Sequence, residues 1–238
     1  MERIAYERFA LLEDTHFWFV GRRAIFFDLL DRELAGRDGL QVLEIGCGAG
    51  GMLGPLRRYG RVHGMDVDRE YLGFCRRRGF TDLLCGSGHD LPFRDQSFDV
   101  IALFDTLEHI PDEHRALTEV RRVLKPGGLA YLYVHSFTSI SGGHHIAWKY
   151  PDREPSTTVP PWDHLREKRF PDIPSWLNGM REHQYREIFE RHFLLEDWLY
   201  THREGEKLLT PEIRAELGEY SEHELLTKGF IAVGAPRP

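Results

Sequence analysis

The stretch 40–52, LQVLEIGCGAGGM, constrains the fold of this chain more than any other. Its first half is mostly apolar and predicts a short buried strand, and the glycines of GCGAGG then turn the chain into a helix. Glycine permits a positive φ in a tight turn, and its missing side chain lets a ligand approach the backbone. Asp66 ends a second apolar run over 62–65, where a carboxylate can bind vicinal ribose hydroxyls. We therefore expect a nucleoside-containing cofactor over the first two strands.

Length and composition indicate one large domain that needs neither disulfides nor a metal to fold, because 238 residues can bury a sizeable core. The net charge of -7 argues against a nucleic-acid partner, which needs a basic face. Cys47, Cys75 and Cys85 show no metal-type spacing, and we interpret them as reduced thiols of a cytoplasmic protein. We expect no membrane partner and no signal peptide, because no apolar run is long enough and MERIAYERFALLED is charged throughout.

Strand and helix patterns alternate along the first half of the chain. Apolar runs over 81–85, 98–104 and 129–134 are separated by helical patterns, which predicts an α/β fold with an open parallel sheet and helices on both faces. Ligands of such sheets bind outside the carboxyl ends of the strands. Gly46, Asp66 and Phe104 all fall on that edge, and Val67 is placed to pack against a flat base.

The segments that flank this alternation differ in character. Residues 1–35 read as an aromatic-rich helical pair, which either packs on the sheet with its arginines in water or forms a lid from which Arg22 or Arg23 reaches a cofactor carboxylate. Residues 136–176 hold six of the 13 prolines and no clear periodicity, and we interpret them as a substrate-covering insertion. Beyond it we expect a helix over 176–192, a strand over 193–200, helix starts near 210 and 221, and a last strand over 229–233.

Four motifs occur in series: VLEIGCGAG, GMD, LPFRDQSFDVI and LKPGG. Together they resemble the class I S-adenosylmethionine (SAM)-dependent methyltransferases, most closely the small-molecule branch that includes ubiquinone and menaquinone methyltransferases. The resemblance covers about residues 40–135. It implies a single domain with a Rossmann-like seven-stranded sheet, order 3-2-1-4-5-7-6 with strand 7 antiparallel. In that domain 36–135 form the cofactor-binding core, and 177–238 complete the sheet and carry an inserted helix.

The resemblance also implies how the methionine end of SAM is held. Glu44, Gly46, Cys47 and Gly48 would surround it, mostly through backbone groups, and Phe104 would offer its backbone carbonyl to the ammonium. Arg22 is our further candidate for the carboxylate. The glycine turn alone also fits the G-x-G-x-x-G of nicotinamide enzymes, so the assignment to SAM depends on the whole series of motifs.

At the adenosine end, the family pattern places Asp66 on the ribose hydroxyls and Val67 on the adenine. Ser87, Gly88 and His89 would flank the adenine edge. The family usually has an aspartate where this chain has Ser87, and that aspartate accepts from the adenine amino group. A serine hydroxyl can also accept a hydrogen bond, but without the charge.

Methyl transfer from a sulfonium is an in-line displacement that requires alignment of the acceptor and exclusion of water. A hydroxyl acceptor gains from a general base, a role that suits histidine near neutral pH. His144 and His145 follow two glycines at the ligand edge and are our candidates for a base or a substrate ligand. His164, beside Asp163, is a third. The alternative is that these histidines hold the insertion together by hydrogen bonds.

Other features of the second half leave alternatives open. His109 follows the fourth strand and is expected to be scaffold near the cofactor. His144, His145, His164 and Asp163 together offer metal-ligand types, but their spacing matches no tight metal motif, so we predict no metal site. Trp148, Trp162 and Trp176 either wall an aromatic or sugar-ring pocket or are structural.

The function predicted from the sequence is SAM-dependent O-methylation of a hydroxyl on a small-molecule metabolite. The segments GGHHIAWKYPD and VPPWDHLR resemble parts of methyltransferases from natural-product or polysaccharide pathways. One alternative is a non-catalytic SAM-binding module, toward which only Ser87 points. A more remote one is a nicotinamide-dependent reductase. The sequence does not indicate the oligomeric state.

Overall fold

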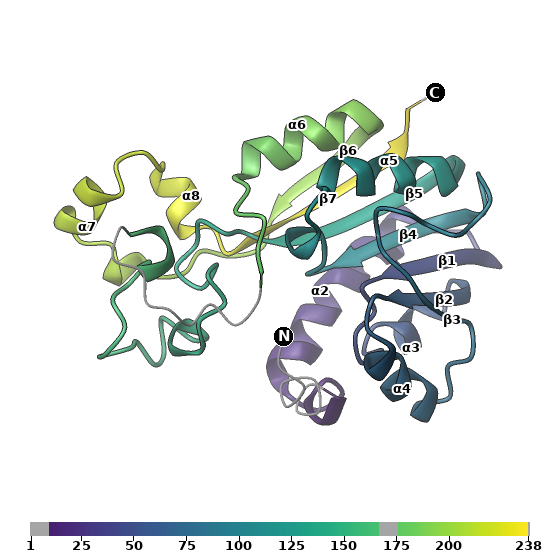
Figure 1. The fold of residues 1–238 in the computed structure, drawn as a ribbon, viewed down its shortest axis with the longest axis horizontal. Helices are drawn as coiled ribbons and strands as arrows, with labels where there is room; N and C mark the ends of the chain where they lie inside the picture. Colours follow the sequence, from purple (N-terminus) through teal and green to yellow (C-terminus); the bar gives the residue numbers. More distant parts are fainter. Residues whose placement is uncertain (1–9, 167–175, 238) are drawn as a thin grey trace.

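The computed structural model describes residues 10–166 and 176–237, in which a seven-stranded sheet runs through the molecule in the order β3-β2-β1-β4-β5-β7-β6 (Figure 1). This is the predicted order. Strands β1 to β5 are parallel to one another, whereas β7 is antiparallel to β5 and β6. The strands are β1 (Leu40–Ile45), β2 (Gly60–Asp66), β3 (Leu83–Cys85), β4 (Phe98–Phe104), β5 (Leu124–His135), β6 (Phe193–Tyr200) and β7 (Gly229–Pro236).

Helices cover both faces of the sheet, as the alternating pattern predicts (Figure 1). One face carries α2 (Phe17–Glu33), α3 (Leu53–Leu56) and α4 (Arg69–Arg77), and the other carries α5 (Glu113–Val123) and α6 (Glu182–His192). Two short helices, α7 (Pro211–Glu216) and α8 (Glu222–Leu226), lie beyond the end of the sheet. Among the described residues, no helix is both long and apolar enough to cross a membrane.

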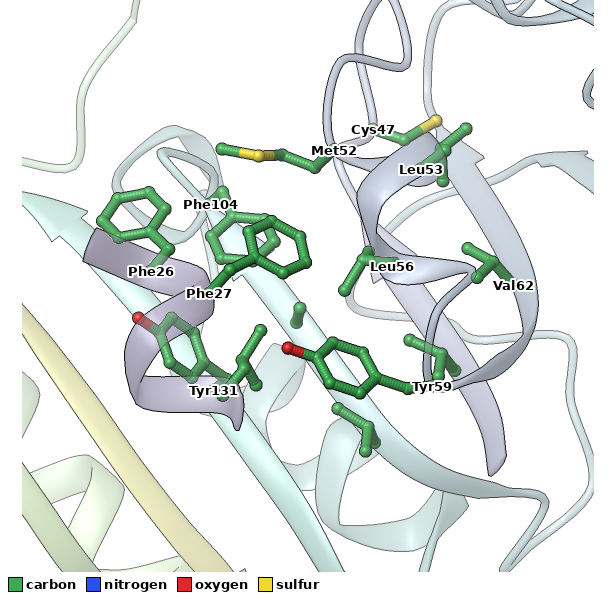
Figure 2. Close-up of a cluster of buried hydrophobic side chains, with 14 of the residues drawn as sticks. Phe26, Phe27, Cys47, Met52, Leu53, Leu56, Tyr59, Val62, Phe104 and Tyr131 are labelled. Atoms are coloured by element: carbon green, nitrogen blue, oxygen red, sulfur yellow. The ribbon is translucent and has the colours of Figure 1, made fainter. Parts of the chain in front are cut away.

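The N-terminal helix α2 is anchored to the carboxyl half of β4 by aromatic packing. Phe26 stacks on Phe104 with 5.3 Å between ring centroids, and Phe27 stacks on Tyr59 at 6.1 Å. Figure 2 shows these rings facing one another across the cluster that also contains Tyr131. Stacked aromatic pairs contribute about 0.5–1.5 kcal/mol each beyond their burial. This packing fixes the position of the side chains that α2 presents at the strand ends.

The described part of the insertion, residues 136–166, packs against α7 and α8 and forms a second lobe with its own apolar core (Figure 1). Trp148 and Trp162 are almost fully buried in that core. Their indole N–H groups donate to the carbonyls of Pro160 and Leu225, both at 3.1 Å. These two tryptophans are therefore structural, whereas Trp176 is 56% exposed.

Two element boundaries differ from the prediction. The helix expected from Trp176 begins only at Glu182, because Asn178 is held in an extended connection by bonds to Glu108 O (2.9 Å) and Leu107 O (3.3 Å). Strand β5 begins at Leu124, immediately after α5, so the KPGG sequence lies inside the strand rather than before it. The helix starts expected near 210 and 221 are confirmed, with side-chain caps from Thr210 and Ser221.

The ion pair between Arg181 and Glu224 joins α6 to α8, with N–O distances of 2.6 and 2.8 Å. We expect Glu224→Gln to lower the free energy of unfolding at pH 7 by about 1–2 kcal/mol, because a charge-assisted pair is lost. The pair lowers the pKa of Glu224 to about 2 from 4.5. Its stabilisation is therefore complete above pH 4.5 and disappears as the pH falls toward 2.

Urea unfolding of both proteins across this pH range tests the expectation. Glu222→Gln, on the same helix, is the matched control. Glu222 makes a single long contact of 3.4 Å with an Arg203 nitrogen, so its loss should cost little stability. Equal losses for the two variants, or a Glu224→Gln loss that persists at pH 2, would contradict the assignment.

Candidate functional site

The glycine loop after β1 is confined between β2 and the end of β4. Gly46 has φ +74°, and a Cβ atom added there would lie 2.3 Å from Thr106 Oγ1, so no other residue fits. The amides of Gly46 and Cys47 both donate to Met65 O, at 2.7 and 3.0 Å. The loop backbone therefore lies over the ends of β1 and β2, where the sequence predicts the methionine end of the cofactor.

Asp66 ends β2 and organises the backbone beside it. Its carboxylate accepts from Gly48 N and from Asp68 N, both at 2.9 Å. Each oxygen keeps a lone pair, since a carboxylate offers about four acceptor sites. Burial raises the pKa of Asp66, while the two backbone N–H groups act in the opposite direction. Val67 is 70% exposed next to it and offers an apolar surface for a planar base.

Glu44 lies within β1 and is almost fully buried. Burial raises the pKa of its carboxyl well above the usual range, and Oε2 has no hydrogen-bond partner among the described residues. A buried acceptor without a partner is uncommon in folded proteins. A ligand ammonium would supply the missing donor and favour the ionised carboxylate, so Glu44 fits the methionine end of SAM.

Arg22 reaches the same region from α2. Its guanidinium forms an ion pair with Asp105, just after β4, and lies 5.6 Å from the Phe26 ring centroid. Arg23 instead donates to Gly51 O at 2.9 Å, across the glycine loop. Contact between Arg22 and the cofactor carboxylate stays a prediction, as does the role of the Phe104 carbonyl, which accepts from Thr106 Oγ1 at 3.0 Å.

The expected adenine edge follows β3. Ser87 Oγ lies 3.1 Å from His89 Nδ1, so the two side chains pair with each other. Gly88 is buried, and a Cβ there would lie 2.7 Å from Ile110 Cδ1. The serine hydroxyl retains acceptor capacity for the adenine amino group, and this contact also stays a prediction.

A histidine cluster occupies the carboxyl ends of β4 and β5. The His144 ring lies 5.2 Å from that of His109 and 4.9 Å from that of His135, measured between centroids. Burial lowers the pKa of all three imidazoles, that of His144 to about 3. They are therefore uncharged at neutral pH. The insertion thus brings one of our three predicted histidines, His144, to the strand ends.

The other two candidates have structural contacts. His145 Nδ1 accepts from Ala147 N at 3.1 Å within its own turn. His164 Nε2 donates to Phe137 O at 2.7 Å, and its ring packs under Gly143, where a Cβ would lie 2.6 Å from it. His164 therefore supports the loop that carries His144. Both His145 and His164 thus have the structural role that we gave as the alternative to catalysis.

Glu108 and His135 lie at the candidate site, although the sequence patterns did not predict them as site residues. Glu108 is almost fully buried directly after β4, and its Oε1 accepts from His135 N at 3.2 Å. Burial and the nearby Asp105 raise its carboxyl pKa well above the usual range. Their positions in the sequence could have indicated them: Glu108 follows the buried strand β4 and His135 ends β5, so both fall on the ligand edge of the sheet.

A buried polar network attaches the second lobe to the sheet beside this cluster. Lys228 Nζ lies 2.8 Å from Glu204 Oε2 and 3.1 Å from Ser141 Oγ, and Ser141 Oγ lies 2.8 Å from His135 Nε2. Such buried pairs need full hydrogen bonding to offset desolvation. The network fixes the start of the loop that carries His144.

Comparison with known proteins agrees with this geometry. Residues 43–132 match the family model described as a methyltransferase domain. A protein from Pyrococcus horikoshii has the same fold over 100% of both chains, with a TM-score of 0.65 and 18% identity. A SAM-dependent methyltransferase from Thermotoga maritima aligns over 98% of this chain and 95% of its own, with a TM-score of 0.62 and 20% identity.

Curated relatives are more similar over a shorter stretch. A fatty-acid O-methyltransferase of Mycolicibacterium smegmatis is 31% identical over 60% of this chain and 47% of its own length. A phthiotriol/phenolphthiotriol dimycocerosates methyltransferase of Mycobacterium ulcerans is 34% identical over 55% of this chain and 43% of its own. The chain thus spans less than half the length of these relatives.

The parallel sheet with its antiparallel β7 and the glycine loop define an α/β domain of the Rossmann-like type. Over residues 43–132 this domain is similar to the methyltransferase-domain family, and SAM-dependent methyl transfer by the chain is a proposal.

Asp66 and Asp68 allow a matched test of the cofactor site. We expect Asp66→Asn to weaken SAM binding about tenfold or more, because a hydrogen bond to a charged acceptor contributes about 1.5–3 kcal/mol. Asp68 caps α4 by accepting from Glu70 N at 2.8 Å, and asparagine caps helices equally well. Asp68→Asn should therefore bind SAM as wild type does. Calorimetric titration measures both, and equal affinities would contradict the role of Asp66.

Proposed function

We propose that this protein transfers the methyl group of SAM to a hydroxyl oxygen of a small-molecule metabolite, in a natural-product or polysaccharide pathway. The observation that carries the proposal is the uncharged pair His109 and His144, which lies at the strand edge next to the expected methionine end. Neutral imidazoles can hold an acceptor oxygen through a hydrogen bond.

The reaction is a displacement at carbon. The acceptor oxygen attacks the methyl group as the bond from sulfur to that methyl breaks, and the hydroxyl proton is released. The products are the methyl ether, S-adenosylhomocysteine and a proton. The cofactor supplies the activated methyl, so the protein has to align the oxygen with it and exclude water.

Two segments are assigned parts in this proposal. The N-terminal helix α2 acts as a lid, from which Arg22 contacts the cofactor carboxylate. Its ion pair with Asp105 supports this placement, since Asp105 directly follows β4. The insertion covers the acceptor and contributes His144, held in place by the contact between Gly143 and His164.

The named activities of the relatives support an acceptor of low molecular mass. One is named as an O-methyltransferase of fatty acids and another as a methyltransferase of phthiotriol and phenolphthiotriol dimycocerosates. The motif series resembles that of the quinone methyltransferases, so phenolic hydroxyls belong in any acceptor panel. Sugar, phenol and hydroxylated lipid acceptors are the classes to compare.

The test measures S-adenosylhomocysteine formation with each acceptor class, for wild type and for His144→Gln. We expect product only when acceptor is present, and a fall of about a hundredfold in kcat/KM for the variant, a typical effect of losing a positioned proton-handling group. SAM affinity should stay within about twofold, because the histidine lies on the acceptor side.

His183→Gln, which changes an exposed histidine of α6, is the control and should retain wild-type kcat/KM. Tight SAM binding without turnover across the whole panel would refute the proposal and favour a non-catalytic SAM-binding module. Thermal stabilisation by a nicotinamide dinucleotide, but not by SAM, would instead revive the reductase alternative.

A further inference from the structure

Three ligand-type side chains converge at the end of β4. One donor atom from each of Glu108, His109 and His144 lies within 4.8 Å of the other two. Glu108 Oε2 and His144 Nε2 are buried and have no hydrogen-bond partner among the described residues. Two buried polar atoms without partners this close together are costly, and each calls for a partner that the described residues do not supply.

The third side chain is oriented from behind. His109 Nδ1 lies 3.0 Å from the carbonyl oxygen of Trp176, so this nitrogen carries the proton and donates. Nε2 then keeps its lone pair. Metal-binding histidines are typically held this way, with the second ring nitrogen donating to a carbonyl or a carboxylate.

We propose that Glu108, His109 and His144 bind a divalent transition-metal cation such as Zn²⁺. Two imidazole nitrogens and one carboxylate oxygen suit Zn²⁺, Fe²⁺ or Co²⁺, whereas Mg²⁺ and Ca²⁺ prefer oxygen ligands alone. Three protein ligands leave at least one coordination position open. Binding of the cation favours the ionised carboxylate of Glu108, whose proton is released to solvent.

The geometry requires a small movement. Metal–ligand bonds of about 2.0–2.2 Å place tetrahedral ligands about 3.4 Å apart. The three donors, which lie within 4.8 Å of one another, therefore converge by at most about 1.4 Å when the ion binds. Rotation of the Glu108 and His144 side chains can supply this shift, because Glu108 Oε2 and His144 Nε2 are not held by hydrogen bonds to other described residues. His144 itself has φ +56°, an uncommon backbone for histidine that is often found at functional sites.

The role of the open position rests on the proposed function: the acceptor oxygen would occupy it, held by the cation in place of a direct hydrogen bond to the two imidazoles. A hydroxyl oxygen bound to the cation becomes more acidic, as metal-bound water does. The oxygen then attacks the methyl group, the bond from sulfur to the methyl breaks, and the hydroxyl proton passes to solvent. The cation is neither oxidised nor reduced.

Sequence spacing did not predict this site, because Glu108 and His109 are 35 or more residues from His144. The histidine-rich set considered there, His144, His145, His164 and Asp163, contributes only one of the three ligands.

The experiment titrates Co²⁺ into the chelator-treated protein, with visible absorption as the readout, and repeats it with Zn²⁺ by calorimetry. We expect saturable binding of a single ion per chain. Glu108→Gln and His144→Gln should each weaken binding at least about tenfold, the scale found even for residues behind the ligands. His145→Gln, which changes the adjacent histidine outside the cluster, should bind the ion as wild type does. SAM binding by every variant shows that each is folded.

Absence of saturable Co²⁺ binding, or equal affinities in all four proteins, would overturn the site. Methyl transfer is measured separately with and without the chelator. Full activity after chelation would overturn the role of the cation in holding the acceptor. Cation binding without methyl transfer to any acceptor would leave the metal site standing and refute the proposed function.

Discussion

The close contact between Gly46 and Thr106 is the constraint on which the cofactor half of the site depends. The Cβ position of Gly46 is already filled by the threonine side chain, so the loop after β1 and the segment after β4 can meet only because residue 46 is glycine. Asp66 then fastens the next turn of the loop through Gly48 N. Three strand ends are thereby held together, and the acidic and apolar groups around them acquire fixed positions. Side chains with no other common feature, such as Glu44 and Val67, become parts of one surface.

This half could be predicted from the sequence because its determinants are local. The apolar strands, the glycine turn and the acid at the end of β2 lie within 27 residues of one another, and parallel pairing of β1 with β2 brings them together. The strand order and the antiparallel β7 followed from the family resemblance rather than from periodicity. The late start of α6 was missed for a physical reason. Asn178 bonds to the backbone of Glu108, and the helical pattern of residues 176–181 does not reveal that tertiary contact.

The acceptor half was much less predictable. Proline, histidine and tryptophan enrichment identified residues 136–176 as unusual, but enrichment does not tell which side chains face the strands. Trp148 and Trp162 proved to be the core of a second lobe, and His164 a support under Gly143. His144 is recognised as a candidate site residue only because the fold places it next to His109 and Glu108, which lie on a different segment. Contacts between segments far apart in sequence leave no spacing pattern, so a histidine that lines the site and one that braces a loop look alike.

The buried pair of Lys228 and Glu204 explains how such a site can nevertheless be well defined. Isolated, either charge would be expensive to bury, but together with Ser141 and His135 they form a connected network at the point where β5, β7 and the second lobe meet. Ser141 lies three residues before His144, so the network fixes the start of the loop, and Gly142 and Gly143 allow the close packing against Phe137 and His164 that continues it. In the proposed function, the cofactor would therefore meet a sheet edge, and the acceptor would meet a loop fixed to that edge. The methyl donor would then be specified by the sheet, and acceptor selection could change by substitutions in the second lobe without disturbing the sheet.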